Sequence, residues 1–444
     1  MESPAATPPV GERRGRLLFP STRAPHLCMF IGIDFGTSNS AVSASAGGAV
    51  TLVPLEEGRD SIPTALFFNA EEHRTAFGRQ AVREYAEGTE GRLMRSIKSV
   101  LGSPLIEEKT IVGGRATGFE EIIAIFLGHL RGIAQAHLHG EITQVVLGRP
   151  VHFVDDDKKR DAQAQQSLAR AARSVGFRDV VFQFEPIAAA LDYEQGLTLE
   201  EVVLVADIGG GTSDFSVIRL GPKRAAATDR QRDILAAGGI HLGGTDFDRK
   251  LSLFAAMPAL GYGSHARDAR IVPASIYFDL ATWHKINFLY ASKELYAAEQ
   301  LRFYYQDAAL HERLMKVLNQ RLGHRIAADV EAAKIAVAGG GVTELDLGYI
   351  EPGLSEPVRE AALTAAIEDE VQRIVASAAA TLQEAGVAAD APLTLYFTGG
   401  STGVRQLRDA FQARFPRGKV VNGDRFSSVA RGLAVHAARM FGKA

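Results

Sequence analysis

Phe30-Ile-Gly-Ile-Asp-Phe-Gly-Thr-Ser-Asn-Ser-Ala-Val42 is the stretch that decides the fold, and it returns in altered form as Leu204-Val-Ala-Asp-Ile-Gly-Gly-Gly-Thr-Ser-Asp-Phe-Ser-Val217. Each copy has an apolar run, a turn that contains glycine, and a second alternating run, which is the pattern of a β-hairpin. Counted from Asp34 to Asp207, the copies lie 173 positions apart. This distance predicts a duplicated lobe, because the units of a solenoid recur every 20–50 residues.

Length, composition and charge limit the kind of protein this sequence can be. A chain of 444 residues exceeds one compact core, so two lobes or domains are expected. Hydrophobic residues make up 46% and the mean hydropathy is close to zero, which is typical of a globular protein. Lysine and arginine number 49 against 52 aspartates and glutamates, whereas nucleic-acid binders usually carry a basic surplus. We therefore expect no nucleic-acid partner.

The single cysteine indicates the compartment of the protein, and the most apolar predicted helix indicates whether the chain enters a membrane. Cys28 cannot form an internal disulfide, which indicates a reducing, cytoplasmic compartment and excludes a cysteine-ligated metal site. The most apolar predicted helix, residues 120–139, is interrupted by polar side chains at His129, Arg131 and Gln135. It is expected to be a buried amphipathic helix, so no membrane partner is predicted.

The first 28 residues form a segment of different composition. They are rich in proline, alanine and arginine and contain no apolar stretch long enough for a secretory signal. We expect a disordered extension. Met29 stands directly before the first predicted strand, so a translation start at Met29 instead of Met1 is the alternative.

The two hairpins carry the residue types that bind a triphosphate. Glycine at Gly36 lets the backbone approach a phosphate closely, and the turn amides can act as anion donors. The hydroxyls of Thr37 and Ser38 add further donors, and Asp34 offers a hard oxygen for a hydrated Mg²⁺. Two such hairpins could hold the β- and γ-phosphates from opposite sides. The alternative is two ordinary glycine hairpins in a β-rich core.

Other nucleotide-binding motifs are missing from the sequence. It contains no GxxxxGK[ST], which excludes a P-loop. Gly209-Gly-Gly211 does not extend to GxGxxG, because Asp214 stands at the last position. Elsewhere strands and helices alternate, as in an α/β fold. The expected elements are strands at 144–147, 180–184 and 393–397, a helix over 155–175, a helix opened by Pro186, and a helix with Leu407, Phe411 and Phe415 on one face.

Further motifs follow the hairpins in a recognisable order: Ile97-Lys-Ser-Val-Leu-Gly102, Phe184-Glu-Pro-Ile-Ala-Ala-Ala190 and Thr398-Gly-Gly-Ser-Thr-Gly403. With them the chain resembles the actin-like ATPase superfamily, and within it the nucleotide-binding domain of the 70 kDa heat-shock chaperones. It is most similar to the YegD-like proteins, which lack the peptide-binding domain. The resemblance implies a duplicated actin-like (ribonuclease H-like) α/β fold, two lobes with a nucleotide cleft between them, ATP or ADP with Mg²⁺ as ligands, and an unknown protein client or co-chaperone.

The resemblance also implies a division of the chain and a role for single positions. The expected parts are an extension (1–28), lobe I (29–198, with a subdomain insertion at about 64–140), lobe II (199–424, with an insertion at about 244–370) and a C-terminal helix that returns to lobe I (425–444). The positions implied to be catalytic are Lys98, Glu185, Asp207 and Asp214. Asp34 and Asp207 are implied to hold Mg²⁺, largely through water. The positions implied to bind nucleotide are Gly36, Thr37, Ser38, Gly209, Gly210, Gly211, Thr212, Gly243, Gly244, Asp246, Glu331, Lys334, Gly399, Gly400 and Ser401.

Several of these positions have simpler interpretations. Lys98 is, on the residues alone, an ordinary solvated lysine. Glu185 precedes a proline, which favours an extended backbone, so it could simply end a strand. Glu331 and Lys334 are spaced i, i+3 on a helix and could form a surface ion pair. The sequence also departs from the family, because Ile335 and Gly403 stand where arginines usually stack on the adenine.

The expected activity is slow ATP hydrolysis by a chaperone-like protein without the peptide-binding domain. In this hypothesis Lys98 and Glu185 place the attacking water, and either Asp207 or Asp214 accepts its proton. Three other functions stay open: a metabolite kinase of the same fold, a nucleotide-binding scaffold that does not hydrolyse ATP, and an actin-like filament protein.

Overall fold

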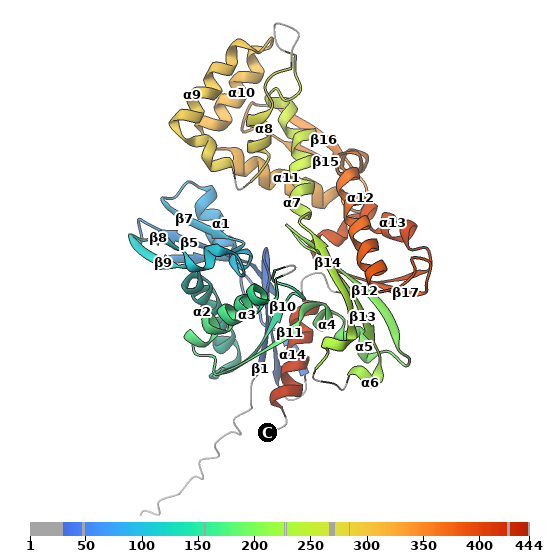
Figure 1. Cartoon of the computed structure of the whole chain (residues 1–444). Coiled ribbons are helices and arrows are strands. Elements are labelled where there is room, and N and C mark those ends of the chain that lie inside the picture. The colour runs from blue at the N-terminus through green and yellow to red at the C-terminus, as the bar shows by residue number, and fades with distance from the viewer. Residues whose placement is uncertain are drawn as a thin grey trace, which may run out of the picture.

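The computed structural model describes residues 30–46, 49–154, 157–225, 227, 229–265, 271–283, 285–423 and 427–442. The expected N-terminal extension, the question of the start at Met29, and Cys28 all lie outside the described residues. The described chain forms two lobes, each built on one mixed sheet (Figure 1).

The sheet of the first lobe has the strand order β11-β10-β1-β2-β3, with β4 paired to β2. The strands are β1 (Phe30–Phe35), β2 (Asn39–Ala46), β3 (Ala49–Leu52), β4 (Ser61–Pro63), β10 (Gln144–Arg149) and β11 (Asp179–Phe184). β1 and β2 form the predicted antiparallel hairpin, while β1, β10 and β11 run parallel. Two helices lie beside this sheet, α2 (Phe119–Leu138) and α3 (Lys158–Ser174) (Figure 1).

The second lobe repeats this pattern in the order β14-β13-β12-β17-β18. Its strands are β12 (Glu201–Ile208), β13 (Ser213–Leu220), β14 (Ile234–Ile240), β17 (Leu393–Thr398) and β18 (Gly418–Asn422). β12 and β13 form the second antiparallel hairpin, and β12, β17 and β18 run parallel. The duplicated α/β fold predicted from the repeat is therefore confirmed.

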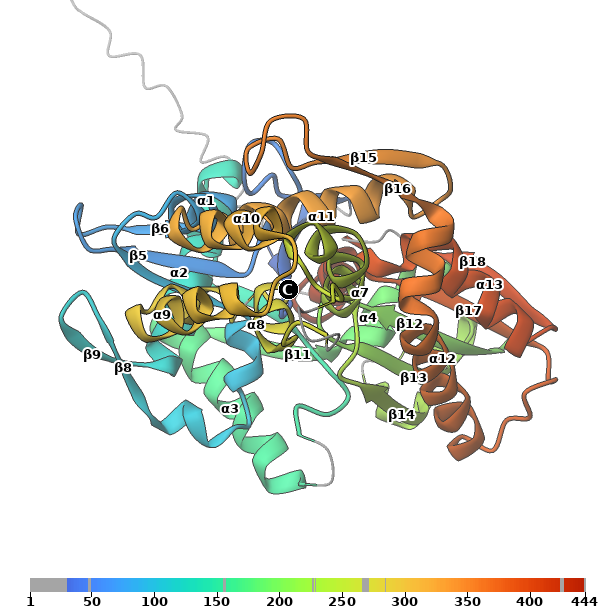
Figure 2. The same cartoon turned by 90° about the horizontal axis from the view of Figure 1, so that it is seen from above.

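Each lobe carries additional elements beyond its large sheet, and Figure 2 shows them from above. In the first lobe these are α1 (Gly78–Ala86), β5 (Ala65–Asn69), β6 (Thr75–Phe77), β7 (Gly91–Arg95), β8 (Lys109–Val112) and β9 (Arg115–Gly118). In the second lobe they are α7 (Gly244–Leu251), α8 (Ser275–Leu280), α9 (Ser292–Gln300), α10 (Ala308–Asn319), α11 (Gly323–Val337), β15 (Val342–Asp346), β16 (Ser355–Arg359), α12 (Glu360–Glu384) and α13 (Arg405–Arg414). Shorter helices are α4 (Glu185–Ala189), α5 (Leu191–Gln195) and α6 (Pro222–Ala225).

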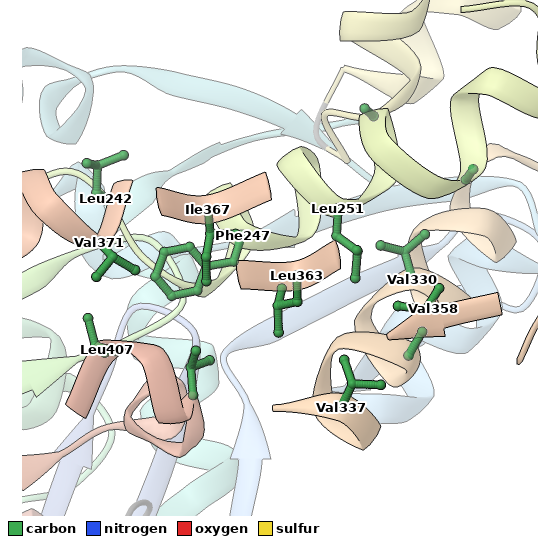
Figure 3. Close-up of a cluster of buried hydrophobic side chains, with 14 of the residues drawn as sticks. Leu242, Phe247, Leu251, Val330, Val337, Val358, Leu363, Ile367, Val371 and Leu407 are labelled. Atoms are coloured by element: carbon green, nitrogen blue, oxygen red, sulfur yellow. The ribbon is translucent and has the colours of Figure 1, made fainter. Parts of the chain in front are cut away.

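The core of the second lobe joins its helices to its sheet. Phe247 and Leu251 on α7 pack with Leu363, Ile367 and Val371 on α12 (Figure 3). These side chains recur every three or four residues, so each helix presents one apolar face to the other. The predicted apolar face of α13 is also fully buried and consists of Leu407, Phe411 and Phe415. In the part of the chain that the structure describes, no helix has the length and apolarity to cross a membrane.

The last helix, α14 (Ser428–Phe441), is packed against the first lobe through small residues. It contacts β1, β2, β10 and α4. Gly432 faces the backbone of Ala188 so closely that any Cβ at this position would overlap the Ala188 carbonyl group. The close approach of α14 to α4 matters because α4 begins with Glu185.

Gly432→Ala should therefore lower the free energy of unfolding by about 1–3 kcal/mol, because the added methyl group meets backbone and forces α14 away from α4. Gly132→Ala is the matched control, since Gly132 lies within α2 and a Cβ there meets no described atom within 4 Å. Removing a flexible glycine from a helix should raise the free energy of unfolding by about 0.5–1 kcal/mol. Denaturant titration measures both; equal effects of the same sign would contradict this account of the contact.

Candidate nucleotide-binding site

A cleft of about 1310 Å³ lies between the lobes and collects most of the predicted positions. The predicted residues that line it are Asp34, Gly36, Thr37, Ser38, Lys98, Glu185, Asp207, Gly209, Gly210, Gly211, Thr212, Asp214, Gly244, Glu331, Lys334, Gly399, Gly400 and Ser401. They come from the two hairpins, from the 3₁₀ helix Ile97–Val100, from α4, α7 and α11, and from the loop after β17. The fold therefore brings together residues that are hundreds of positions apart.

The turns of the two hairpins face each other across this cleft. A Cβ added to Gly210 in the second turn would lie 2.6 Å from the hydroxyl oxygen of Ser38 in the first turn. The two loops are thus near contact, and a side chain at Gly210 would have to displace one of them. In the second hairpin Asp207 and Asp214 are register partners on β12 and β13, so both carboxylates stand at the same end of the strands.

Lys98 and Glu185 form an ion pair inside the cleft. Nζ of Lys98 donates to Oε1 of Glu185 at 2.6 Å, and the exposed fractions of the side chains are only 10% and 15%. Burial acts to lower the pKa of Lys98, but the charges of Glu185 and Asp34 outweigh it and raise this pKa. Lys98 is therefore not the ordinary solvated lysine that its sequence context suggests.

The position of Glu185 also differs from its sequence-based expectation. Glu185 is the first residue of α4, and the extended residue before the helix is Phe184. Pro186 does not prevent this, because residues in the first helical turn need no hydrogen-bonded amide. The expectation that Glu185 ends a strand was wrong: a helix start holds its carboxylate toward the cleft.

Acidic side chains gather around Lys98 in greater number than it can neutralise. Burial, followed by the charge of Glu185, raises the pKa of Asp34 to about 8. Burial, followed by the charge of Asp214, raises the pKa of Asp207 to about 7. Burial also raises the pKa of Asp214, whose Oδ2 accepts a hydrogen bond from the Thr212 hydroxyl at 2.8 Å. Like charges so close together resist ionisation, so the cluster favours an added cation.

The donor set fits Mg²⁺ better than a metal bound directly by protein. Among the residues that the structure describes, no three histidine, cysteine, aspartate or glutamate groups are placed to hold a metal ion together. Mg²⁺ commonly keeps several waters and takes one or two carboxylates plus phosphate oxygens. The carboxylates of Asp34 and Asp207 suit this kind of binding.

Backbone contacts around Gly209 form another part of the cleft. The amide of Gly244 donates to the Gly209 carbonyl oxygen at 3.0 Å, and the hydroxyl of Ser401 donates to the same oxygen at 2.7 Å. Thr245 donates through its amide to the Gly210 carbonyl oxygen at 2.7 Å. The second hairpin, the start of α7 and the loop after β17 are thereby joined.

Lys334 is held in this region by a partner that the sequence did not indicate. Its Nζ lies 2.7 Å from Oδ1 of Asp248 and donates to the Gly244 carbonyl oxygen at 3.2 Å. Lys334 is buried whereas Glu331 is exposed, so the expected alternative of a surface ion pair between them was wrong. Burial raises the pKa of Asp248 to about 6 despite the opposing charge of Lys334. Asp248 was not among the predicted site residues, although it lies only two residues after the predicted Asp246.

Two predicted positions shape the site from outside the cleft. Oδ2 of Asp246 accepts from the Gly243 amide at 3.0 Å, which caps the start of α7. Among the described residues that line the cleft, neither Gly243 nor Asp246 appears. Ile335 and Gly403, in contrast, do line it, and the side chain of Ile335 is 65% exposed. The two positions at which the sequence lacks the arginines that usually stack on adenine therefore lie on the cleft wall.

Two mixed sheets of the same topology, with glycine turns that meet across a cleft, define a nucleotide-binding fold of the actin-like ATPase type. A family model described as Hsp70 protein matches residues 30–259, which is more than half of the 444 residues. The chain belongs to the Hsp70 protein family. The matched segment includes both glycine hairpins, and membership of this family implies ATP binding.

Gly243→Ala should weaken nucleotide binding about tenfold or more. A Cβ at Gly243 would lie 2.7 Å from the Gly209 carbonyl oxygen and 2.7 Å from backbone atoms of Gly210, so α7 must move away from the second turn. Gly339→Ala is the control, because a Cβ there meets no described atom within 4 Å. Isothermal titration with ADP measures both variants; equal affinity in the Gly243 variant and the control would contradict the role of this close contact.

Proposed function

We propose that this protein binds ATP with Mg²⁺ in the interlobe cleft and hydrolyses it slowly. The observation that carries the proposal is the buried pair of Lys98 and Glu185, set among the three carboxylates of Asp34, Asp207 and Asp214. Phosphoryl transfer depends mainly on positioning and on neutralising charge, and this cluster supplies groups for both. Membership of the Hsp70 family supports the ATPase assignment.

The side chains in this proposal have separate tasks. The ammonium group of Lys98 binds the γ-phosphate and, with the Glu185 carboxylate, orients a water molecule for attack. Donors to the phosphate oxygens come from the turn hydroxyls of Thr37, Ser38 and Thr212 and from turn amides. The proton of the water passes to Asp207 or Asp214, whose raised pKa values suit a proton acceptor near neutral pH.

Asp34 and Asp207 would hold Mg²⁺ through its water shell. The ion, when bound, neutralises charge on the β- and γ-phosphates. Asp34 lies on β1 close to the turn of the first hairpin, and Asp207 lies on β12 close to the turn of the second. An ion held by both would join the lobes through the nucleotide. Closure of the lobes on ATP is the proposed output of the site.

The finer features of the assignment are proposals as well. We propose a chaperone-like protein of the YegD-like type, located in the cytoplasm, with a protein client or co-chaperone as its partner. The proposed lobe I spans 29–198, lobe II spans 199–424 and the C-terminal helix spans 425–444. What supports this division is that each proposed lobe contains one of the two large sheets.

A scaffold that binds nucleotide without hydrolysing it is the second candidate. The observation that favours it is the exposed Ile335 on the cleft wall, where the family commonly provides an arginine for the base. Without that arginine, affinity for the base depends on apolar contact and on the backbone around Gly209. Tight ATP binding with no release of phosphate would favour the scaffold.

Lys98→Ala should reduce phosphate release by at least about a hundredfold while ATP binding changes little, because the lysine acts on the γ-phosphate and the water and not on the adenosine. Lys109→Ala serves as the control, since Lys109 is an exposed lysine on β8. Single-turnover phosphate release and equilibrium ATP binding are measured on both variants and the wild type. Unchanged hydrolysis in Lys98→Ala would remove the lysine from the mechanism.

A further inference from the structure

Arg95 reaches from the first lobe to an aromatic ring of the second lobe at the rim of the cleft. It is the last residue of β7, and its guanidinium carbon lies 4.1 Å from the centre of the Trp283 ring. Trp283 follows α8 in the second lobe. In Figure 1 the blue strand β7 lies below the yellow helices of the other lobe, so the two side chains come from different lobes.

A second contact accompanies the first. The ring of Tyr85 on α1 meets the ring of His324 on α11 edge-on, with 4.9 Å between the centroids. His324 in turn lies 6.5 Å from the Trp283 ring. Tyr85, Arg95, Trp283 and His324, two side chains from each lobe, are called the rim cluster below.

The charges in the rim cluster allow its four side chains to lie close together. Burial lowers the pKa of His324 to about 4, and the charge of Arg95 acts in the same direction. His324 is therefore neutral at pH 7 and does not repel the guanidinium. Burial lowers the pKa of Arg95, while the charge of Glu331 opposes this change. A guanidinium stays charged under these conditions, so Arg95 lies over the Trp283 indole ring as a cation.

Arg95 also belongs to the nucleotide cleft itself. It lines the cleft together with Glu331, Lys334 and Ile335 on α11. The second-lobe wall carries Ile335 where a base-stacking arginine is commonly found, so Arg95 brings a guanidinium to this cleft from the other lobe. Trp283 is not among the described residues that line the cleft. Arg95 therefore contacts both the cleft and an indole ring outside its lining.

Arg95 is further coupled to the proposed catalytic lysine by a short segment. Only Ser96 and Ile97 separate Arg95 from Lys98, and Ser96 has a left-handed backbone with φ of 55°. A non-glycine residue in this conformation is uncommon and persists where its surroundings fix it. A shift of Arg95 away from Trp283 therefore also disturbs the start of the 3₁₀ helix Ile97–Val100 that carries Lys98.

We propose that Arg95 is a nucleotide-retaining residue, which closes the cleft from the first lobe by stacking on Trp283. The nucleotide leaves when this contact breaks, so the rim cluster sets the release rate. The inference rests on the proposed nucleotide binding. It adds the contact between Arg95 and Trp283, and neither residue is among those assigned to hydrolysis.

Release of a fluorescent ADP analogue, measured by stopped-flow chase with unlabelled ADP, tests the proposal. Arg95→Ala should speed release roughly 3- to 30-fold, which is the range expected for loss of a partly desolvated cation–π contact. Arg92→Ala is the matched control, because Arg92 is an exposed arginine on the same strand. It should release the analogue at the wild-type rate. Trp283→Phe should give an intermediate rate, since phenylalanine binds a cation more weakly than tryptophan.

Trp283 offers an independent readout because it is the only tryptophan in the chain. Saturating ADP should shift its emission in the wild type and in Arg92→Ala, and should shift it much less in Arg95→Ala. Wild-type release rates in both Arg95→Ala and Trp283→Phe would overturn the closing contact while leaving nucleotide binding intact. Failure of the wild type to bind the analogue in equilibrium titration would overturn the proposed function itself. If Arg95→Ala does not fold, the release rate of the fluorescent analogue from Trp283→Phe decides the matter.

Discussion

The carbonyl oxygen of Gly209 is the acceptor on which the rest of the cleft depends. It receives the Gly244 amide and the Ser401 hydroxyl, so three segments that are distant in the chain are joined at one atom. A Cβ at Gly244 would lie only 2.5 Å from the Ser401 hydroxyl oxygen, which shows how little room the arrangement leaves. Because this frame consists largely of backbone, its geometry does not rely on flexible side chains.

The part of the cleft around Lys98 depends on charge instead of backbone contact. Lys98 is paired with Glu185 but lies among further carboxylates, and burial, followed by these neighbouring charges, raises the pKa values of Asp34 and Asp207. A desolvated excess of negative charge is unfavourable, and a cation that arrives with a nucleotide relieves it. Arg95 stands in the same segment as Lys98, so the rim of the cleft and its charged floor are mechanically connected.

The sequence was a good guide to local structure and a poorer one to partners. Both hairpins and the apolar face of α13 were predicted correctly, because alternation and helical periodicity are properties of neighbouring residues. Glu185 was expected to be extended, yet α4 begins at it, since Pro186 is tolerated in a first helical turn. Lys334 was considered as a partner of Glu331, but it pairs with Asp248 on another helix. Spacing along one helix cannot reveal a partner that the fold brings in from elsewhere.

By itself the sequence determined that the chain contains two related hairpins with phosphate-binding residue types, and hence a duplicated α/β fold. Those features can be recognised locally, because glycine turns and alternating strands are patterns of neighbouring residues. Only the tertiary structure decided that Lys98 is buried against Glu185, that Asp246 caps α7 and does not line the cleft, and that Arg95 stacks on Trp283. Each of these contacts depends on the relative position of two packed elements. Burial of the whole apolar core determines that position, and no single motif does.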